Sequence, residues 1–157
     1  MRKRVGKAGG QDTASDDNKW LDLESIAEVE VTSEDPEFPI ESAMIAGESQ
    51  GWLAAAPGPQ TILLKFDAPQ RFTRIMLRFV EGAQERTQEF SLSWSTDGGR
   101  SFREIVRQRW NFSPSGSTSE AEDYRVDLAN VTALKLVIDP DLGRNVARAG
   151  LARLRLA

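Results

Sequence analysis

Hydrophobic and polar residues alternate with a period of two along much of the chain from residue 26 onwards. In residues 89–95 (EFSLSWS), Phe90, Leu92 and Trp94 fall on one face, and serines occupy the other. Residues 133–139 (ALKLVID) show the same alternation. Such alternation over short segments is typical of antiparallel strands that cover a core with one face. The pattern therefore predicts β-strands.

Eight segments have this strand-like character, with turn residues between them. They are residues 26–33, 61–67, 71–80, 89–95, 101–110, 123–128, 133–139 and 151–157. In the last segment, Leu151 is out of phase with Leu154 and Leu156, which predicts a local bulge. No segment has the pattern of an amphipathic helix longer than one or two turns. The chain is therefore expected to form an all-β, antiparallel sandwich.

The pattern S-x-D-x-G-x-x-F in residues 95–102 resembles the Asp-box of sialidase-type propellers. A propeller repeats such a motif in successive blades of about 40–50 residues, whereas this chain contains it once. The Asp97–Gly99 turn is therefore expected to be a hairpin connection, in which glycine supplies the positive φ. By the same reasoning, Trp94 is expected in the core. Trp52 is a second residue that we expect in the core.

The 157-residue chain contains no cysteine and no histidine. Thiol nucleophiles, Ser-His-Asp triads and metal sites built on His or Cys are therefore excluded. A chain of this length buries about 68–70% of its unfolded surface and needs no disulfide to form one domain. Catalysis by paired carboxylates stays open, but the short strands imply no deep cleft. We therefore expect a non-catalytic protein without a cofactor.

Residues 1–19 are rich in Gly, Asp and Lys and contain almost nothing to bury. We expect them to be a flexible N-terminal tail, followed by a single domain over residues 20–157. No apolar stretch follows the basic start MRKRVGK, and no run approaches the roughly 18 apolar residues of a membrane span. These features predict a cytoplasmic protein with no membrane span.

Charge is distributed unevenly along the chain, whose formal net charge is −4. No basic residue occurs between Lys19 and Lys65, whereas acidic residues are frequent between Asp22 and Glu48. A nucleic-acid-binding domain needs a positive face on its folded part. The acidic balance therefore predicts no nucleic-acid partner.

Three segments of the chain resemble the motifs of a known domain family and occur in the same order as in that family. GESQGWLA (residues 47–54) leads into residues 57–79, ERTQEFSLSWSTDGGRSFREI fills residues 85–105, and residues 133–157 close the chain. Together they resemble discoidin domains, the coagulation factor V/VIII type C modules of the galactose-binding-like superfamily. Many bacterial carbohydrate-binding modules share this fold. The resemblance covers residues 25–157 and implies an eight-stranded jelly-roll β-sandwich that binds carbohydrate.

One position departs from the family pattern. Many discoidin domains hold a structural calcium with carbonyl groups of the first loop and a glutamate of the last strand, where this chain has Arg153. A guanidinium cannot ligate a hard cation that takes oxygen ligands. The departure predicts no structural calcium. Either Glu48 pairs with Arg153 in place of the ion, or Arg153 is solvated.

Successive connections in an antiparallel sandwich alternate between its two ends. Residues 68–70, the Asp97–Gly99 turn, residues 129–132 and the C-terminus are expected at one end. The longer loops, residues 46–60, 80–88, 110–122 and 139–148, then gather at the other end. Binding sites are commonly built on loops held by a rigid scaffold, and the resemblance implies sugar binding at this end.

Sugar recognition needs bidentate polar groups for adjacent hydroxyls and an aromatic face for the C–H bonds of the ring. The long loops contain both kinds of side chain. The expected ligand-binding residues are Glu81, Arg86, Trp110, Asn111, Phe112, Arg144 and Asn145. Trp110 or Phe112 would be the aromatic platform, and the polar residues would bind hydroxyl groups.

Each candidate also has a structural interpretation. Trp110 could cap the mouth of the sandwich, and Phe112 could anchor its loop. Arg86 could brace its loop against Glu89 or against the acidic cluster Glu120, Glu122 and Asp123. Arg144 and Asn145 could belong to a solvated turn.

Two functions therefore stay open, a carbohydrate- or glycoconjugate-binding module and a protein-interaction scaffold that has lost sugar binding. An exposed aromatic ring beside Arg and Asn would favour the first, and a flat, charged mouth with a buried Trp110 the second. A deep acidic cleft would instead favour a carboxylate-based hydrolase.

Overall fold

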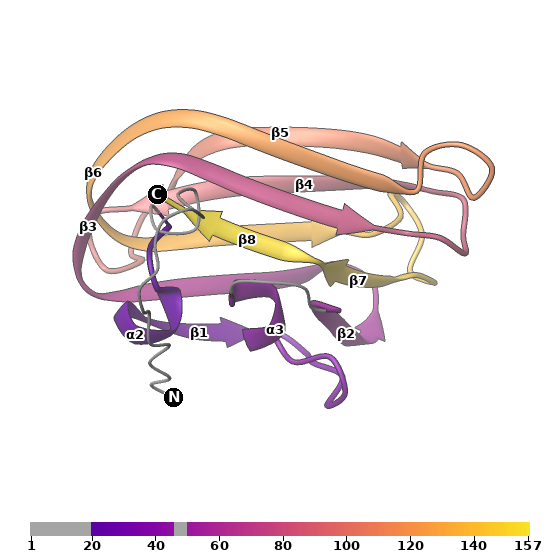
Figure 1. Ribbon diagram of the computed structural model, residues 1–157, viewed down its shortest axis with the longest axis horizontal. Coiled ribbons are helices and arrows are strands. Elements are labelled where there is room, and N and C mark those ends of the chain that lie inside the picture. The colour runs from indigo at the N-terminus through magenta and orange to yellow at the C-terminus, as the bar shows by residue number, and fades with distance from the viewer. Residues whose placement is uncertain (1–19, 46–49) are drawn as a thin grey trace, which may run out of the picture.

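The structure is a computed structural model that describes residues 20–45 and 50–157. Within these residues the chain forms eight strands and two four-residue helices (Figure 1). In chain order they are α2 (Leu23–Ile26), β1 (Ala27–Val31), α3 (Glu41–Met44), β2 (Trp52–Pro57), β3 (Gln60–Val80), β4 (Arg86–Ser95), β5 (Arg103–Phe112), β6 (Ser119–Asp139), β7 (Arg148–Leu151) and β8 (Arg153–Leu156). The predicted all-β fold is confirmed. The predicted tail, residues 1–19, lies outside the described residues.

Two long bent strands, β3 and β6, connect the two layers of the sandwich (Figure 1). The first arm of β3 pairs with the second arm of β6, as in Ile62 opposite Leu136. The second arm of β3 pairs with the first arm of β6, as in Leu77 opposite Glu122. The predicted turn at residues 68–70 is therefore a bend within one strand. Pairing between β3 and β6 shifts register at this bend, between Lys65 and Arg74, and Asn130 of β6 has a positive φ of 59°.

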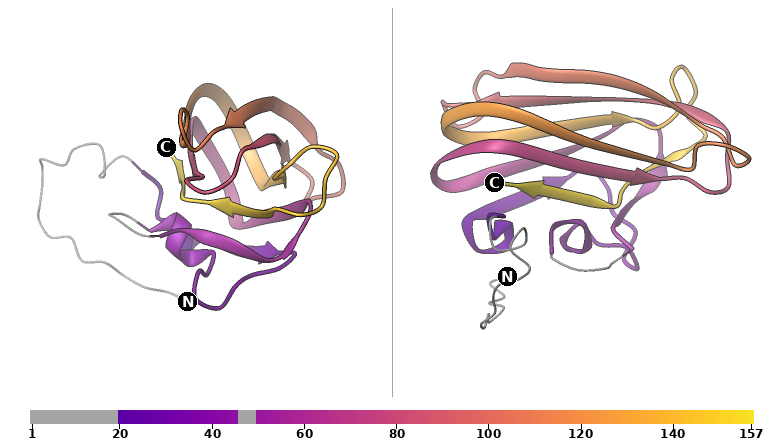
Figure 2. Two further views of the ribbon diagram at one scale, coloured as in Figure 1. Left: turned by 90° about the vertical axis from the view of Figure 1, so that its right-hand side faces the viewer. Right: turned by 45° about the horizontal axis from the view of Figure 1, so that its top comes forward.

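The larger layer contains five strands in the order β1-β3-β6-β4-β5. The smaller, three-stranded layer consists of β8, the second arm of β3 and the first arm of β6. All of these pairs are antiparallel, and β2 and β7 form a separate two-stranded pair. Figure 2 shows the two layers facing each other. This is the predicted eight-stranded jelly-roll sandwich.

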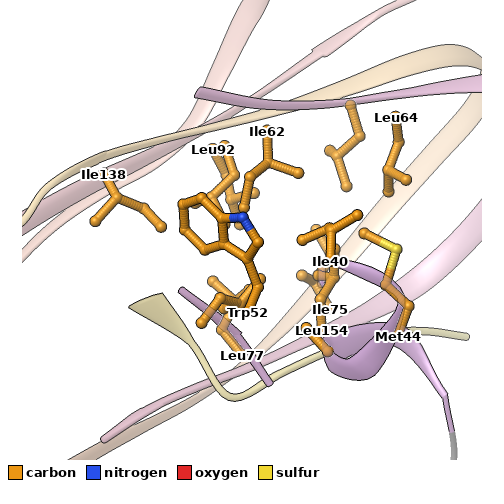
Figure 3. Close-up of a cluster of buried hydrophobic side chains, with 14 of the residues drawn as sticks. Ile40, Met44, Trp52, Ile62, Leu64, Ile75, Leu77, Leu92, Ile138 and Leu154 are labelled. Atoms are coloured by element: carbon orange, nitrogen blue, oxygen red, sulfur yellow. The ribbon is translucent and has the colours of Figure 1, made fainter. Parts of the chain in front are cut away.

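The core lies between the inner faces of the two layers. Trp52 is 2% exposed and lies among Ile62, Leu92 and Ile138 (Figure 3). Its indole Nε1 donates a hydrogen bond to the Ser33 carbonyl oxygen at 3.1 Å, so the one polar atom of the ring is satisfied. The predicted core position of Trp52 is confirmed. Trp94 packs half-buried against the same core.

The turn after β4 is the predicted hairpin connection. The Asp97 carboxylate accepts hydrogen bonds from the hydroxyls of Ser95 and Ser101, both at 2.6 Å. These bonds, led by that from Ser101, hold the pKa of Asp97 well below its usual value. Gly98 and Gly99 have φ values of 77° and 95°, which side-chain-bearing residues rarely adopt.

The predicted bulge near the C-terminus is a break between two strands. Leu151 ends β7 opposite Trp52, whereas β8 begins at Arg153 and pairs with β3. The intervening Ala152 amide donates to the Arg78 carbonyl oxygen at 2.8 Å. No helix in residues 20–45 and 50–157 is long and apolar enough to span a membrane.

The loops gather at the two ends of the sandwich as the alternation predicts. At one end, the Gly98 amide donates to the Thr132 hydroxyl at 2.8 Å. At the other end, the Glu81 amide donates to the Thr118 carbonyl oxygen, which joins the β3–β4 and β5–β6 loops. The second end contains the candidate site.

Candidate functional site

An open pocket of about 530 Å³ lies at this second end, which faces the viewer in the left panel of Figure 2. Its lining comes from the start of β4, the end of β5 and the β6–β7 loop. The lining residues are Glu85, Arg86, Thr87, Asn111, Phe112, Ser113, Asp141, Leu142 and Arg144. The volume falls within the range of about 300–1,000 Å³ that is usual for small-molecule sites.

Hydrogen bonds join the β6–β7 loop to the start of β4. The Leu142 amide donates to the Thr87 carbonyl oxygen at 2.8 Å. The Thr87 amide donates to Asp141 Oδ1 at 3.3 Å. Because these bonds fix two walls of the pocket against each other, a ligand would bind to a preformed site and lose less conformational entropy.

Arg86 holds the floor of the pocket, and its side chain is only 4% exposed. Its Nε donates to Glu81 Oε1 at 2.7 Å, and its Nη1 donates to Gln88 Oε1 at 3.1 Å and to the Pro140 carbonyl oxygen at 2.7 Å. The guanidinium carbon lies 4.7 Å from the centre of the Phe112 ring. One side chain thus connects the β3–β4 loop, the β6–β7 loop and the end of β5.

The bracing interpretation of Arg86 is confirmed, but its expected partners are wrong. Glu89 points to the outer face of the five-stranded layer, where it accepts hydrogen bonds from Arg107 and Arg109, both at 2.9 Å. The partner of Arg86 is instead Glu81, five residues before it. The error arises because side chains in a strand alternate between faces, so Arg86 and Glu89 lie on opposite sides of β4.

Glu81 is held in place by three hydrogen bonds. Its carboxylate accepts from Arg86 and from the amides of Ala83 and Gln84. Burial alone would raise the pKa of Glu81, but these hydrogen bonds outweigh it and keep the pKa below its usual value. Glu81 therefore stays ionised and positions Arg86, and it does not line the pocket.

Neither aromatic residue expected as the platform is exposed in the pocket. Phe112 is 0% exposed and lies beneath Arg86. Trp110 is half-buried on the inner face of β5, and its Nε1 donates to the Ser117 hydroxyl at 3.1 Å. The expectation of an exposed aromatic platform is therefore wrong. Strand β5 continues to Phe112, so alternation turns both rings toward the interior.

Three polar groups at the pocket are left for a ligand. Asn111 Oδ1 accepts from the Thr87 hydroxyl at 2.7 Å, and its amide nitrogen has no partner among the described residues. Asp141 uses one carboxylate oxygen, Oδ1, to accept from Thr87, and Oδ2 forms no hydrogen bond within the described part of the chain. The exposed Arg144 guanidinium forms no hydrogen bond or ion pair in that part either.

Four of the seven predicted residues line the pocket, namely Arg86, Asn111, Phe112 and Arg144. Asn145 lies outside the pocket and next to Gly58. Its Oδ1 atom would be 3.4 Å from a Cβ atom at position 58. The sequence prediction missed Thr87 and Asp141. Both are polar residues in segments 80–88 and 139–148, which the sequence analysis assigns to this end of the sandwich. That position was the signal by which they could have been found.

The donor set that family members use for calcium does not fit here. Arg153 replaces the glutamate, and it lies in β8 opposite Arg78, a second cation. Residues 20–45 and 50–157 contain no group of three or more acidic side chains that could hold a metal ion. Glu48 lies outside the described residues, so its pairing with Arg153 stays a prediction.

No protein-family model and no curated protein sequence matches the chain. Solved structures are similar to it. A CBM32-5 module from Clostridium perfringens, in complex with GalNAc-β-1,3-galactose, is 21% identical, with 88% of this chain and 99% of that chain covered and a TM-score of 0.63. The family 32 carbohydrate-binding module of C. perfringens NanJ, in complex with galactose, is 14% identical, with coverages of 83% and 92% and a TM-score of 0.60.

A third similar structure is the CBM32 module of AlyQ in complex with 4,5-unsaturated mannuronic acid. It is 17% identical, with 85% of this chain and 95% of that chain covered and a TM-score of 0.61. At these identities the likeness concerns the fold. It confirms the predicted jelly-roll fold.

Proposed function

We propose that the protein is a non-catalytic carbohydrate-binding module whose site is the pocket between β4, β5 and the β6–β7 loop. The observation that carries this proposal is the set of polar groups left without partners among the described residues: the Asn111 amide, Asp141 Oδ2 and the Arg144 guanidinium. Sugar hydroxyls both donate and accept hydrogen bonds. An amide donor, a carboxylate acceptor and a forked guanidinium donor suit adjacent hydroxyls.

The lining suggests a weak, mainly polar mode of binding. None of the nine lining residues offers an exposed aromatic ring, and Leu142 is the half-buried apolar side chain that faces the pocket. Without stacking on a ring, a monosaccharide would depend on a few hydrogen bonds. We expect a dissociation constant on the order of 1 mM.

The non-catalytic assignment is supported by the lack of histidine and cysteine in the sequence. Structures with the same fold include modules bound to galactose and to GalNAc-β-1,3-galactose. A closer relation to discoidin domains is part of the proposal and is supported by the motif order in residues 47–157. The cytoplasmic location stays a prediction, which cell fractionation would test.

Calorimetric titration of the full chain with galactose, N-acetylgalactosamine, glucose and galacturonate tests the proposal. Asn111→Ala and Arg144→Ala should each weaken binding about fivefold or more, since each removes hydrogen bonds worth about 1 kcal/mol. Asn145→Ala and Arg100→Ala are matched controls outside the pocket and should change affinity less than about twofold. The proposal fails if the folded protein binds none of these sugars, or if the controls weaken binding equally.

A protein-interaction scaffold is the second candidate function. The observation that favours it is the charged lining, with Glu85, Asp141 and Arg144 and no exposed ring. A folded chain that binds none of the four sugars would favour this second function.

A further inference from the structure

The outer face of the three-stranded layer is rich in arginine. In β8, Leu154 and Leu156 turn inward and are at most 1% exposed, so Arg153 and Arg155 turn outward. In the second arm of β3, Ile75 is fully buried, and its neighbours alternate in the same way. The outward arginines of the three strands that are at least partly exposed are Arg71, Arg74, Arg78, Arg125 and Arg153, whereas Arg155 also turns outward but is only 6% exposed. We call this surface the arginine face.

Strand pairing brings these cations next to one another. Arg78 lies opposite Arg153, and Arg74 lies opposite Arg125. Neighbouring strands are about 4.8 Å apart, and alternate residues of one strand are about 6.7 Å apart. Like charges directly opposite each other destabilise a sheet. A local cost of this kind points to a function that needs the charges.

Two acidic residues on this face pair with two of its arginines. Asp123 accepts two hydrogen bonds from Arg74, at 3.0 and 2.7 Å. Asp127 accepts one from Arg71 at 2.8 Å. The side chain of the exposed Arg78 forms no hydrogen bond or ion pair with another described residue. The exposed Arg125 forms neither in that part of the chain, but its charge, after the hydrogen bonds from Arg74, helps to lower the pKa of Asp123.

This positive face belongs to a chain of net charge −4, because the acidic residues are concentrated elsewhere. Glu28 and Glu30 lie on β1, which is an edge strand of the other layer. At physiological ionic strength, exposed charges act over about 8 Å. A ligand at the arginine face would therefore experience a local positive field that the total charge conceals.

We propose that the arginine face binds a linear polyanionic polysaccharide, a glycan that carries carboxylate or sulfate groups along its length. Guanidinium groups pair with such oxyanions in a bidentate manner. A sheet face with cations repeated along and across its strands suits an extended chain with regularly repeated anions. This surface is separate from the pocket, so the proposal stands even if the pocket binds no sugar.

Apart from its positive charge, the same face lacks the features by which proteins recognise nucleic-acid bases. Trp20 is covered by Arg74 at 4.6 Å and by Arg155 at 5.6 Å, so its ring is not available to stack on a base. Single-stranded nucleic acids bind to exposed aromatic rings, and reading a duplex takes an element that enters a groove. The arginines of this face all lie on strands. An anionic glycan therefore fits it better than DNA or RNA.

Affinity electrophoresis of the full chain in gels that contain polygalacturonate, dextran sulfate or neutral dextran tests the proposal, with a DNA duplex titrated separately. Wild-type protein should bind both polyanions and not dextran, and the affinity should fall as salt rises. The double variant Arg78→Glu/Arg125→Glu should bind about tenfold more weakly or worse. The control Arg100→Glu/Arg103→Glu carries the same total charge and should bind within about twofold of wild type. Circular dichroism must show that both variants are folded.

Several results would overturn the proposal: no retardation by either polyanion, equal weakening in both double variants, or tighter binding to the DNA duplex than to polygalacturonate. Loss of polyanion binding in Asn111→Ala would also overturn it, since that result would assign the ligand to the pocket. Failure of sugar binding at the pocket would leave it intact.

Discussion

Glu120 is a buried carboxyl group that should link the stability of the fold to pH. It is 1% exposed and lies on the inner face of β6 opposite Phe79. The side chains of Gln88 and Glu122 lie beside its carboxyl group. Burial, together with the neighbouring Glu122 carboxyl group, raises the pKa of Glu120 from 4.5 to about 8.

The sign and size of the effect follow from this pKa. Between pH 4.5 and pH 8, folded chains keep a proton on Glu120 that unfolded chains have released. The free energy of unfolding must therefore fall as pH rises through this range. A difference of one proton corresponds to at most about 1.4 kcal/mol per pH unit, or about 4 kcal/mol between pH 5 and pH 8.

The variant Glu120→Gln keeps the shape of the side chain and removes the proton equilibrium. Urea unfolding, followed by tryptophan fluorescence at pH 5, 6, 7 and 8, should show the variant gaining stability over wild type as pH rises. Glu28→Gln, at an exposed position of β1, is the control and should give a profile parallel to that of wild type. A constant difference between Glu120→Gln and wild type across these pH values would refute the reasoning.

Three further predictions concern single side chains. Arg86→Met should lower the free energy of unfolding, measured in urea, by about 3 kcal/mol, because it leaves the Glu81 carboxylate without its cation. The control Arg109→Met, at an exposed ion pair, should lower it by less than about 1 kcal/mol. Equal losses in the two variants would contradict the bracing role of Arg86. Asp97→Asn should lower the melting temperature at pH 7, since the Asp97 carboxylate accepts hydrogen bonds from two serine hydroxyls of the hairpin. The control Thr96→Ala should leave the melting temperature unchanged. An unchanged melting temperature in Asp97→Asn would contradict a stabilising role of the carboxylate. Trp110→Phe should leave sugar affinity within about twofold of wild type, and a larger loss in the calorimetric titration would return Trp110 to the site.

The strands and the end of the sandwich that carries the pocket could be predicted from sequence because both follow from the period of two. Phe90 and Leu92 are each 0% exposed, as their alternation with serine indicates. Once the strands are placed, antiparallel topology assigns every loop to one end. Loops that are far apart in sequence, such as those at Asn111 and Arg144, are thereby predicted to meet, and they do.

The errors concern strand limits and side-chain partners. Ending the fifth predicted segment at Trp110 placed Phe112 in a loop, although the alternation of Val106, Gln108 and Trp110 continues to Phe112. The partner of Arg86 depends on how the β3–β4 loop folds back, and no local pattern encodes that fold. The arginine face was missed because net charge averages over surfaces that point in different directions.

An amide-correlation NMR titration of the full chain with galactose and N-acetylgalactosamine tests most directly whether the pocket binds sugar. We expect saturable shifts confined to residues 85–87, 111–113 and 141–144, the three segments that line the pocket. Saturable shifts at the opposite end, around residues 95–101, or a well-folded spectrum that no sugar changes, would contradict it.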